Sequence, residues 1–565
     1  QKSAPVRVVI LGGGFGGVAV AKELEKLLPR LDQTVEVTLI SQSNYLLFVP
    51  MLPSAAAASI GLTHILSPLR DLLKRTRIRV ESVESIDLAA KTVTTTHPST
   101  HYEQIIPWDY LVIALGNSVN LARLPGVAQH GLPIKTIGDA LQIRNRALEM
   151  LESAENTEDR DHRCRMLTFV VAGGGYSGVE IAAELNDYLR EVERKSYPVI
   201  QASDVRVILL HSGKRILPEI SESLAQFAHH KLAERGVDIR LGARLASATA
   251  SQVTLESGEK IDAHTLIVAI GSAPNPVVQQ LGLPMERGRI RVDETLRLAG
   301  QDAAWALGDC AAVPLPKKSG EFAPPTAQFA MREGKTLARN IVAAIQGKAP
   351  RKFGFTGLGE MVSLGDGSAV AELFGKIKVS GPLAWLMWRT FYLMRLPGLE
   401  RKVRVWLDWN LDRVFSRDLV QLNVQRTERV THAHYEPGQD IIRQGDLADA
   451  FYVIVRGTVE VLREEDGQVT SLAHLSDGES FGELGLLQHR RRGATVRAVE
   501  PVDVIALGRS DFDLLAGTWK HLSQSLDDVA RARTNPQDVL GADGPDDMTG
   551  GELTGNGRSS PRSPA

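Results

Sequence analysis

Residues 6–17, VRVVILGGGFGG, and residues 168–178, TFVVAGGGYSG, decide the fold. Each stretch is a run of β-branched and apolar residues that ends in a glycine-rich loop and leads into a helical pattern. Such a run is typical of a buried parallel strand, and both loops match the pattern GxGxxG. Glycines at these positions let the backbone approach a pyrophosphate, and the N-terminus of the following helix offers N–H groups to it. The two stretches therefore predict two dinucleotide-binding units.

The chain repeats the rest of this unit as well. The first copy continues with VEVTLI at 35–40 and closes with YLVIALG at 110–116, whereas the second continues with VRVILL at 205–210 and closes with TLIVAIG at 265–271. Such a duplication indicates two dinucleotides in one chain, a tightly held flavin and a nicotinamide donor. A further strand, AAWALGD at 303–309, ends in Gly-Asp.

The candidate cofactor-binding residues lie in these loops and at the strand ends. Asp309 is placed to hydrogen-bond the ribityl or pyrophosphate part of a flavin. The second strand of such a unit usually ends in an acidic residue that binds a ribose hydroxyl, but here Ser41 and His211 stand there. Because Lys214 and Arg215 follow His211, the choice between NADH and NADPH stays open. The predicted cofactor-binding residues are Gly12, Gly14, Phe15, Gly16, Gly17, Ser41, Gly116, Gly308, Asp309, Gly173, Gly175, Tyr176, Gly178, His211 and Gly271.

The composition excludes several classes of protein. The chain has 565 residues, of which 43% are hydrophobic and 23% charged, as in folded globular proteins. A net charge of −2 offers no global attraction for nucleic acid, and we expect no such partner. Cys164 and Cys310 form no CxxC pair, which excludes a disulfide framework and a Cys-rich zinc site, so no metal site is predicted. No apolar run reaches transmembrane length, and no signal peptide is recognisable.

A segment rich in aromatic and basic residues follows the second unit. Four of the seven Trp residues lie in residues 385–409, with Arg and Lys interleaved. Helical spacing of i, i+3, i+4 and i+7 relates Trp385, Trp388, Arg389 and Tyr392. Aromatic rings favour the headgroup level of a bilayer, and basic side chains attract anionic lipids. The segment predicts an amphipathic helix on a membrane surface, and the alternative is a helix packed on the core or on a partner chain.

Residues 6–424, about three quarters of the chain, resemble a type II NADH:quinone oxidoreductase. The matching segments are VVILGGGFGG, NYLLFVPMLPSAAAASI, YLVIALGN, VVAGGGYSGVEIAAEL, RILPEI, TLIVAIG, ALGDCA, PPTAQFAMREG and GPLAWLMWRTFYL. The glycine motifs mark only the superfamily, whereas the TAQ and AWxxWR segments point to this family. The resemblance implies a non-covalent FAD, hydride transfer from NADH, electron transfer to a quinone without proton pumping, and attachment to one membrane face.

The resemblance also implies roles for individual residues. Ala327 and Gln328 match the quinone-site pair of the family, where the Gln amide can donate to a quinone carbonyl. Glu180 matches a glutamate near the nicotinamide and the quinone, where desolvation can raise its pKa for a proton relay. Glu184, one helical turn further on, is its nearest competitor. Two lysines are candidates for the lysine near the quinone entrance, Lys376 and Lys378.

Residues 428–520 resemble a cyclic-nucleotide-binding domain. The resemblance rests on PGQDIIRQGD, YVIVRGTVEV, FGELGLL and RGATV. Glu483 can accept a hydrogen bond from a ribose hydroxyl, and the fork of Arg492 can pair with a cyclic phosphate. Gly493 lacks the Thr hydroxyl that helps some such domains select cGMP, which favours cAMP. The predicted nucleotide site comprises Phe481, Gly482, Glu483, Leu484, Arg492, Gly493, Ala494 and Thr495. A degenerate domain that binds no nucleotide is the alternative.

The predicted fold is α/β, with two Rossmann-like dinucleotide-binding domains, a membrane-surface segment and a β-roll. The predicted boundaries are 1–125 and 295–350 for the FAD-binding domain, 165–290 for the NAD(P)H-binding domain, 351–424 for the membrane-associating region (383–417 on the membrane), 428–525 for the β-roll and 534–565 for a disordered tail. We expect a homodimeric NADH:quinone oxidoreductase, peripheral to the cytoplasmic face of the cell membrane and modulated by cAMP. A sulfide:quinone-type flavoprotein and a redox or cyclic-nucleotide sensor with little turnover are the alternatives.

Overall fold

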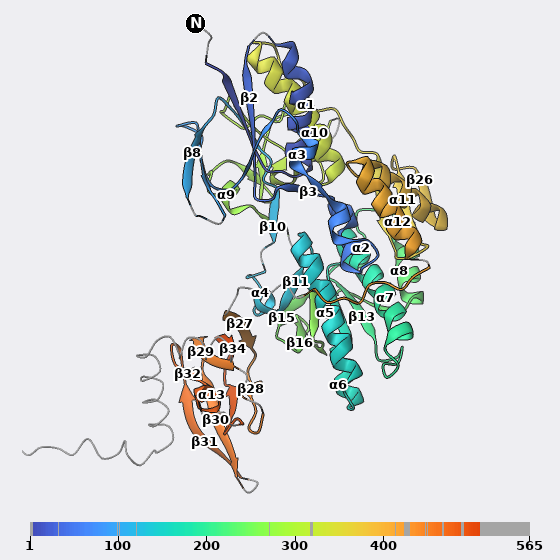
Figure 1. The fold of residues 1–565 in the computed structure, drawn as a ribbon, viewed down its shortest axis with the longest axis vertical. Helices are drawn as coiled ribbons and strands as arrows, with labels where there is room; N and C mark the ends of the chain where they lie inside the picture. Colours follow the sequence, from blue (N-terminus) through green and yellow to red (C-terminus); the bar gives the residue numbers. More distant parts are fainter. Residues whose placement is uncertain are drawn as a thin grey trace, which may run out of the picture. The chain divides into compact units, whose positions relative to one another are not determined.

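The chain forms two compact units, Gln1–Gln425 and Arg426–Ala565, and each is described by itself (Figure 1). The computed structural model describes residues 4–31, 33–98, 100, 102–119, 121–270, 272–316, 320–412, 414–422, 430–446, 448, 450–465, 468–487 and 491–508. Gly271, the end of the predicted β-roll at 509–525 and the predicted tail at 534–565 lie outside the described residues.

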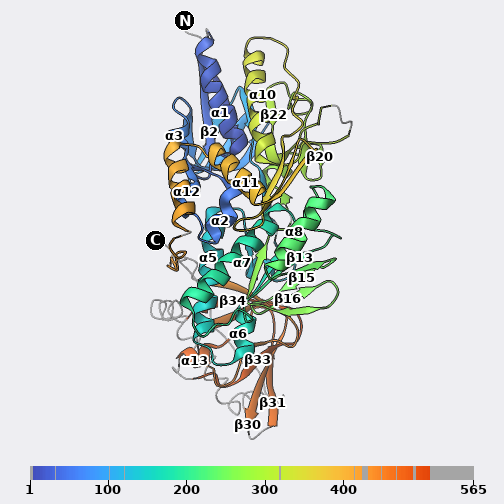
Figure 2. The ribbon, with the colours of Figure 1, turned by 90° about the vertical axis from the view of Figure 1, so that its right-hand side faces the viewer.

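The first glycine loop joins a five-stranded parallel sheet. Its order is β22-β9-β1-β2-β5, with β1 (Val6–Leu11), β2 (Val35–Ser41), β5 (Arg77–Val80), β9 (Tyr110–Ile113) and β22 (Ala304–Ala306). Helices α1 (Phe15–Leu27) and α10 (Ala327–Ile345) lie side by side in Figures 1 and 2. They can approach closely because Gly334 has no side chain. A Cβ at this position would lie 2.8 Å from the Gly16 carbonyl oxygen. This contact brings the TAQ segment at the start of α10 to the first glycine loop.

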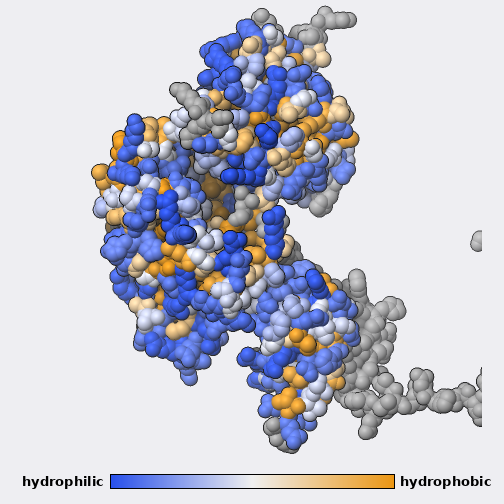
Figure 3. Space-filling view, turned by 180° about the vertical axis from the view of Figure 1, so that it is seen from behind, coloured by the Kyte–Doolittle hydropathy of each residue, from blue (hydrophilic) through white to orange (hydrophobic). Residues whose placement is uncertain are grey.

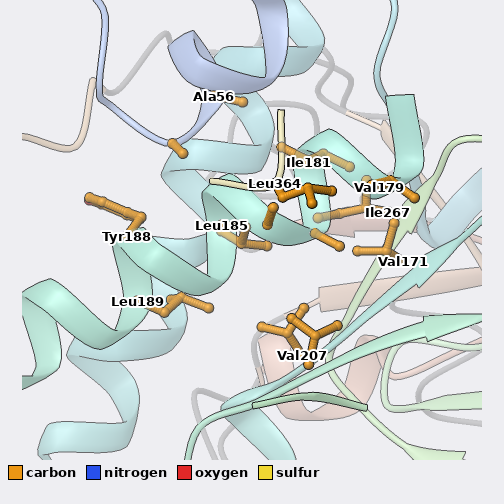
Figure 4. Close-up of a cluster of buried hydrophobic side chains, with 14 of the residues drawn as sticks. Ala56, Val171, Val179, Ile181, Leu185, Tyr188, Leu189, Val207, Ile267 and Leu364 are labelled. Carbon is orange, nitrogen blue, oxygen red and sulfur yellow. The ribbon is translucent and has the colours of Figure 1, made fainter. Parts of the chain in front are cut away.

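The second sheet repeats the order of the first. It runs β11-β18-β12-β13-β14 and is parallel, with β11 (Gly131–Pro133), β12 (Thr168–Ala172), β13 (Arg206–His211), β14 (Val237–Leu241) and β18 (Thr265–Val268). Strand β12 lies between β13 and β18 as β1 lies between β2 and β9, which confirms the duplicated α/β fold. Helix α7 (Tyr176–Ser196) buries Val179, Ile181 and Leu185 in the core that also contains the strand residues of Figure 4.

Smaller elements complete the first unit. Antiparallel sheets are formed by β6 (Ser82–Asp87), β7 (Thr92–Thr96) and β8 (Glu103–Pro107), by β15 (Leu245–Ala248), β16 (Gln252–Leu255) and β17 (Lys260–Asp262), and by β24 (Gly359–Ser363), β25 (Ala369–Leu373) and β26 (Ile377–Gly381). The strands β10 (Asn117–Val119) and β19 (Ser272–Pro274) pair with each other. Further helices are α2 (Leu52–Ala56), α5 (Ile137–Glu155), α6 (Arg160–Met166), α8 (Glu222–Glu234), α11 (Pro382–Arg395) and α12 (Leu399–Leu411), and Gly308–Cys310 forms a 3₁₀ turn.

The aromatic residues that helical spacing relates on α11 face the core, and membrane attachment of the segment stays a prediction. Trp388 is only 3% exposed and belongs to the same core cluster as Trp409 of α12, while Tyr392 packs against that core. The guanidinium of Arg389 stacks on Trp385 at 3.8 Å. The helical spacing of these residues therefore marks the face that covers β24–β26, because burying aromatic area against the sheet stabilises the unit.

The other faces of α11 and α12 carry exposed apolar side chains. They are Leu383, Leu386, Met394, Leu399, Val403, Trp406, Leu407 and Leu411. Figure 3 shows hydrophobic patches set among hydrophilic residues on the one face that it draws. None of the helices in the described part of the chain is long and apolar enough to span a bilayer.

The described part of the second unit forms two four-stranded antiparallel sheets, as the β-roll prediction requires. Their orders are β27-β34-β29-β32 and β28-β33-β30-β31. The strands are β27 (Val430–Tyr435), β28 (Asp440–Ile442), β29 (Ala450–Arg456), β30 (Val459–Glu465), β31 (Gln468–Leu475), β32 (Ser480–Phe481), β33 (Thr495–Ala498) and β34 (Val502–Gly508), and α13 spans Glu483–Leu487. Ile454, Val459 and Val502 are among the core residues that both sheets bury.

Two glycines of one loop allow a matched stability test. In Gly178→Ala the new Cβ would lie 1.7 Å from the Gly173 carbonyl oxygen, so α7 must shift. In Gly175→Ala the nearest atom is 4.0 Å away. We expect Gly178→Ala to lower the free energy of unfolding by about 3 kcal/mol or more and Gly175→Ala by about 1 kcal/mol at most. Thermal unfolding measures both, and equal melting temperatures would contradict the close contact at Gly178.

Candidate active site

A cavity of about 850 Å³ lies where the two glycine loops meet. Phe15 of the first loop and Tyr176 of the second both line it, as do Gly308 and Asp309. The start of α10 and one side of α11 complete the wall, and most of the lining is apolar. Residues that are far apart in the sequence thus surround one space large enough for a flat ring system and a second substrate.

The loops fit two dinucleotides. Gly12 and Gly173 have φ angles of +111° and +122°, which favour glycine. A Cβ on Gly14 would meet nothing within 4 Å, so a ligand can approach the backbone there. The N-caps of α1 and α7 make no side-chain hydrogen bond, and the first-turn N–H groups are therefore available to phosphate oxygens.

The residues that end β2 and β13 occupy matching places. A Cβ on Gly13 would lie 2.4 Å from Ser41 Oγ, and one on Gly174 would lie 2.7 Å from the ring of His211. The Gly174 N–H donates to His211 Nδ1 at 3.2 Å. Because Nδ1 accepts in that bond, Nε2 is the ring nitrogen that can donate to a ligand. His211 thus offers a donor where an acidic residue would offer an acceptor, which suits a 2′-phosphate as well as a ribose hydroxyl.

Buried charge surrounds Asp309. Burial raises the pKa of Asp309, whereas the positive charges of Lys135 and Arg289 lower it. The Gly308 N–H donates to Glu333 Oε2 at 2.8 Å, which fixes the turn against α10. Burial also raises the pKa of Glu333 to about 7. This turn can therefore hold a polar part of a flavin at the edge of the cavity.

The structure separates the two glutamates on α7. Glu180 lines the cavity, and its Oε1 accepts the Ser363 N–H at 3.0 Å. Burial raises the pKa of Glu180 to about 8, and the charge of Glu184 adds to this shift. Glu184 instead lines a second, polar cavity of about 560 Å³ and accepts from Ser54 Oγ at 3.1 Å. Glu180 is therefore the α7 carboxyl that can hold a proton beside a ligand.

Ala327 and Gln328 both line the cavity. The Gln328 amide is held on three sides, because Nε2 donates to the Gly359 carbonyl oxygen at 3.1 Å and to Glu360 Oε1 at 3.3 Å, while Oε1 accepts the Leu358 N–H at 3.2 Å. The predicted donation from Gln328 to a quinone therefore needs a rearrangement of these bonds. It stays a prediction.

Lys376 and Lys378 lie exposed at and after the turn between β25 and β26. Lys378 Nζ donates to Ser223 Oγ at 3.2 Å. The described lining of the cavity includes neither lysine, but it does include Arg395. The structure does not decide between the two lysines, and their predicted role stays a prediction.

Sequence reasoning missed Glu360 as a cavity residue. It lies on β24, is half-buried and lines the cavity together with Glu180. Burial raises the pKa of Glu360 to about 7, the charge of Glu219 adds to the shift, and the Gln328 bond opposes it. The segment LGE at 358–360 carries no spacing signal, so only the fold reveals this carboxyl.

The two cysteines are not part of the cavity wall, although Cys310 directly follows Asp309 in the chain. Cys310 is buried, with its Sγ 3.2 Å from the Leu307 carbonyl oxygen, and Cys164 lies on α6 near Asp204. Neither lines the described cavity. A sulfide oxidoreductase needs paired cysteines at the flavin, so this arrangement disfavours that alternative. Across the described residues no cluster of three His, Cys, Asp or Glu side chains could hold a metal ion.

In the second unit the predicted nucleotide residues come together. Arg492 is buried, and its guanidinium donates to the Gly482 carbonyl oxygen at 2.8 Å and to that of Ala450 at 2.7 Å. Glu483 is buried at the start of α13, and Thr495 Oγ1 accepts the Gln444 N–H at 3.0 Å. Phe481 is buried, whereas Leu484, Ala494 and Gly493 are half-buried or exposed.

Known families match nearly the whole described chain. Residues 6–334 match the pyridine nucleotide-disulphide oxidoreductase family, residues 358–418 the NDH2 C-terminal domain, and residues 432–517 the cyclic nucleotide-binding domain. The type II NADH:quinone oxidoreductase Ndh of Mycobacterium tuberculosis is 30% identical over 73% of this chain and 89% of its own length. The chain belongs to the type II NADH:quinone oxidoreductase family. It is an oxidoreductase enzyme that carries a cyclic nucleotide-binding domain.

Other relatives of this family widen the picture. The demethylphylloquinone reductase NdbB of a Synechocystis species is 32% identical over 71% of this chain and 95% of its own length. The solved structure of NDH2 from Plasmodium falciparum in complex with NADH shares the fold, with a TM-score of 0.66, 20% identity, and coverage of 74% of this chain and 100% of that one. The sulfide:quinone oxidoreductase of Aquifex aeolicus also shares the fold, with a TM-score of 0.54, 21% identity and coverage of 73% and 96%. The fold alone therefore does not separate these activities.

The burial of Glu180 predicts a pH-dependent stability. Its pKa is about 8 in the folded protein and ordinarily 4.5. Between these values the unfolded chain ionises this carboxyl while the folded chain keeps it protonated, so the wild type loses stability as the pH rises. Glu180→Gln cannot ionise and still offers an oxygen to the Ser363 N–H. We expect the free energy of unfolding of Glu180→Gln to exceed that of the wild type by an amount that grows with pH. Between pH 4.5 and about pH 8 this difference should grow by up to about 1.4 kcal/mol per pH unit.

Urea unfolding at several pH values measures this difference. Glu158→Gln, at an exposed site, is the control and should follow the wild type at each pH. A Glu180→Gln variant that follows the wild type throughout would show that the folded protein holds Glu180 ionised.

Proposed function

We propose that this chain is an FAD-dependent oxidoreductase that carries electrons from NADH or NADPH to a membrane quinone. The observation that supports this most is the cavity, because both glycine loops, Glu180 and the Ala327–Gln328 pair reach the same apolar space. A binding module needs neither the second loop nor a buried acid between them. The two loops hold the two dinucleotides, FAD at the first and the nicotinamide nucleotide at the second.

The residues of the chain divide the work of such a reaction. A bound flavin supplies a two-electron carrier between the two substrates. The N-termini of α1 and α7 hold the pyrophosphates, and Asp309 orients the flavin. The apolar walls exclude water, and Glu180 holds a proton close to the substrate at neutral pH.

The cavity opens toward the exposed apolar surface of α11. Leu386 and Met394 are 57% and 71% exposed, and both also line the cavity. Trp406 and Leu399 extend this apolar surface along α12. A helix pair of this kind can lie in the interface of a bilayer. We therefore propose peripheral membrane attachment through these faces, which would let a quinone enter directly from the lipid.

The second unit is proposed to bind a cyclic nucleotide and to modulate turnover. Support comes from the β-roll and from Gly482, Glu483 and Arg492, which lie together at the start of α13. Control of activity requires that cAMP bind two conformations of the enzyme with different affinity. The homodimer and the cytoplasmic face stay predictions.

The purified, FAD-loaded enzyme should oxidise NADH over many turnovers only when a soluble quinone is present. We expect Glu180→Gln to lower this rate by about ten-fold or more, because a positioned acid contributes at least that much, while FAD stays bound. Stopped-flow absorbance of NADH and of the flavin measures both effects. A wild-type enzyme that holds FAD but reduces no quinone would contradict the proposed function and favour the sensor alternative.

The same assay tests the other ligands. Replacing NADH by NADPH decides the nucleotide preference, and titration with cAMP tests control by the second unit. Arg492→Ala should remove any effect of cAMP and leave the basal rate unchanged. Loss of the basal rate would instead assign the second unit a structural role.

Membrane attachment has a matched test of its own. Leu399→Glu with Trp406→Glu places two charges on the proposed membrane face, so we expect vesicle binding to fall by about ten-fold or more. Ile105→Glu is the control, because Ile105 is also exposed, at 70%, but lies on β8. Co-sedimentation with vesicles of mixed neutral and anionic lipid measures binding. An equal loss in both variants would contradict the proposed face.

A further inference from the structure

Besides Asp309, the cavity wall holds two glutamates, the buried Glu180 and the half-buried Glu360. Glu180 lines the cavity from α7 and Glu360 from β24, and each accepts a different hydrogen bond. Glu180 is tied to the Ser363 backbone, whereas Glu360 is tied to the Gln328 side chain. The resemblance to the family assigns a role to Glu180 and none to Glu360, so the presence of Glu360 in the cavity wall requires its own explanation.

The side-chain amide of Gln328 already uses its N–H groups in hydrogen bonds within the protein. Its amide nitrogen has two hydrogens, and these point to the Gly359 carbonyl oxygen and to Glu360 Oε1. A quinone oxygen arriving beside Gln328 would therefore find no spare N–H. A neighbouring group that can offer a hydrogen, and also give up its proton, is the Glu360 carboxyl in its protonated form.

The surroundings of Glu360 favour that form. Apart from Gln328, the groups that act on it are negative or neutral: the exposed Glu219, and the hydroxyls of Tyr176 and Tyr392. Burial, with the charge of Glu360 among the smaller causes, raises the pKa of both tyrosines. The Tyr176 hydroxyl is buried and has no hydrogen-bond partner in the described part of the chain, so it is available to a bound ligand. Arg395 lines the same cavity, and Glu372 faces Glu360 across the β24–β25 pair.

We propose that Glu360 is a second proton donor of this cavity, held in place by Gln328, which gives its proton to one carbonyl oxygen of the quinone. This inference rests on the proposed function. The net reaction is NADH + H⁺ + quinone → NAD⁺ + quinol, in which the quinone gains two electrons and two protons. The Glu360 O–H bond breaks as one quinol O–H bond forms, and the carboxylate regains its proton from water on the side of Glu219. Glu180 gives its proton to the other oxygen and regains one from the hydrogen that NADH brings as hydride, so that one proton in all is taken from water.

Glu360→Gln tests this assignment. The Gln side chain keeps an oxygen for the Gln328 amide, so the local structure should persist, but it cannot give up a proton at an oxygen. In the wild type we expect quinone reduction to slow above about pH 7, where the donor is lost. In Glu360→Gln we expect the rate below this pH to fall by about ten-fold or more. The decline near pH 7 should disappear, and only the later decline near pH 8 that Glu180 causes should remain. Reduction of the flavin by NADH without quinone should stay within about two-fold of the wild type.

Two further variants separate a proton donor from a structural residue. Glu372→Gln removes a carboxyl that lies on β25 directly opposite Glu360 and outside the described cavity lining. The rates and the pH profile of this variant should match those of the wild type. Glu219→Gln removes a negative charge near Glu360 and thereby lowers its pKa, so the declining limb should move to lower pH. A purely structural role of Glu360 predicts no such movement.

Infrared difference titration adds a readout that does not depend on turnover. Among the protonated carboxyl bands that titrate between about pH 7 and pH 8, the wild-type spectrum should contain one that is missing in Glu360→Gln, whereas the bands of Glu180 and Glu333 should remain. An unchanged pH profile in Glu360→Gln, an equal loss at every pH, or the absence of such a band would each overturn the assignment. Failure of the wild type to reduce any quinone would remove the proposed function itself, whereas a fully active Glu360→Gln removes only this inference.

Discussion

The contact between two backbones at a glycine is the constraint on which the rest of the first unit depends. A Cβ at Gly17 or Gly178 would lie 2.0 or 1.7 Å from a carbonyl oxygen of the preceding loop. Because no side chain is present, each helix can begin directly at the carboxyl end of its central strand. The N–H groups at that helix start then face the space where a pyrophosphate fits. Helix α7 in turn places Glu180 two residues after its close contact, at the wall of the cavity.

Apolar walls give the cavity its acid chemistry. An ionised carboxylate costs free energy in a site from which water is excluded, so burial favours the protonated form. Glu180, Glu333 and Glu360 accordingly have pKa values of about 8, 7 and 7. Only Glu180 and Glu360 line the described cavity, whereas Glu333 fixes the Gly308 turn. The same burial thus favours the protonated carboxyl at two positions of the cavity wall and at a third beside the Gly308 turn.

Helix α11 lies between the cavity and the outer surface, because one of its faces packs on the core and another lines the cavity and is exposed. Trp388 and Tyr392 pack inward, while Leu386 and Met394 contribute both to the cavity wall and to the exposed apolar surface. A lipid-soluble substrate could pass along this helix without crossing a polar layer. Arg389 supports the arrangement from the inside by stacking on Trp385 and Trp409, at 3.8 and 4.8 Å from the ring centroids.

The sequence alone determined the duplicated α/β fold, the positions of both glycine loops and the β-roll, because strand composition, glycine spacing and turn chemistry are local properties of the chain. It also singled out Glu180, which lies within one turn of such a loop. The direction of the Trp388 face, the bonds that hold Gln328 and the place of Glu360 in the cavity were decided only by the tertiary structure. Ser363 is 183 residues from Glu180, and Glu360 is 32 residues from Gln328. No local pattern encodes such pairings, since they arise when α7, α10 and β24 are packed around the same space.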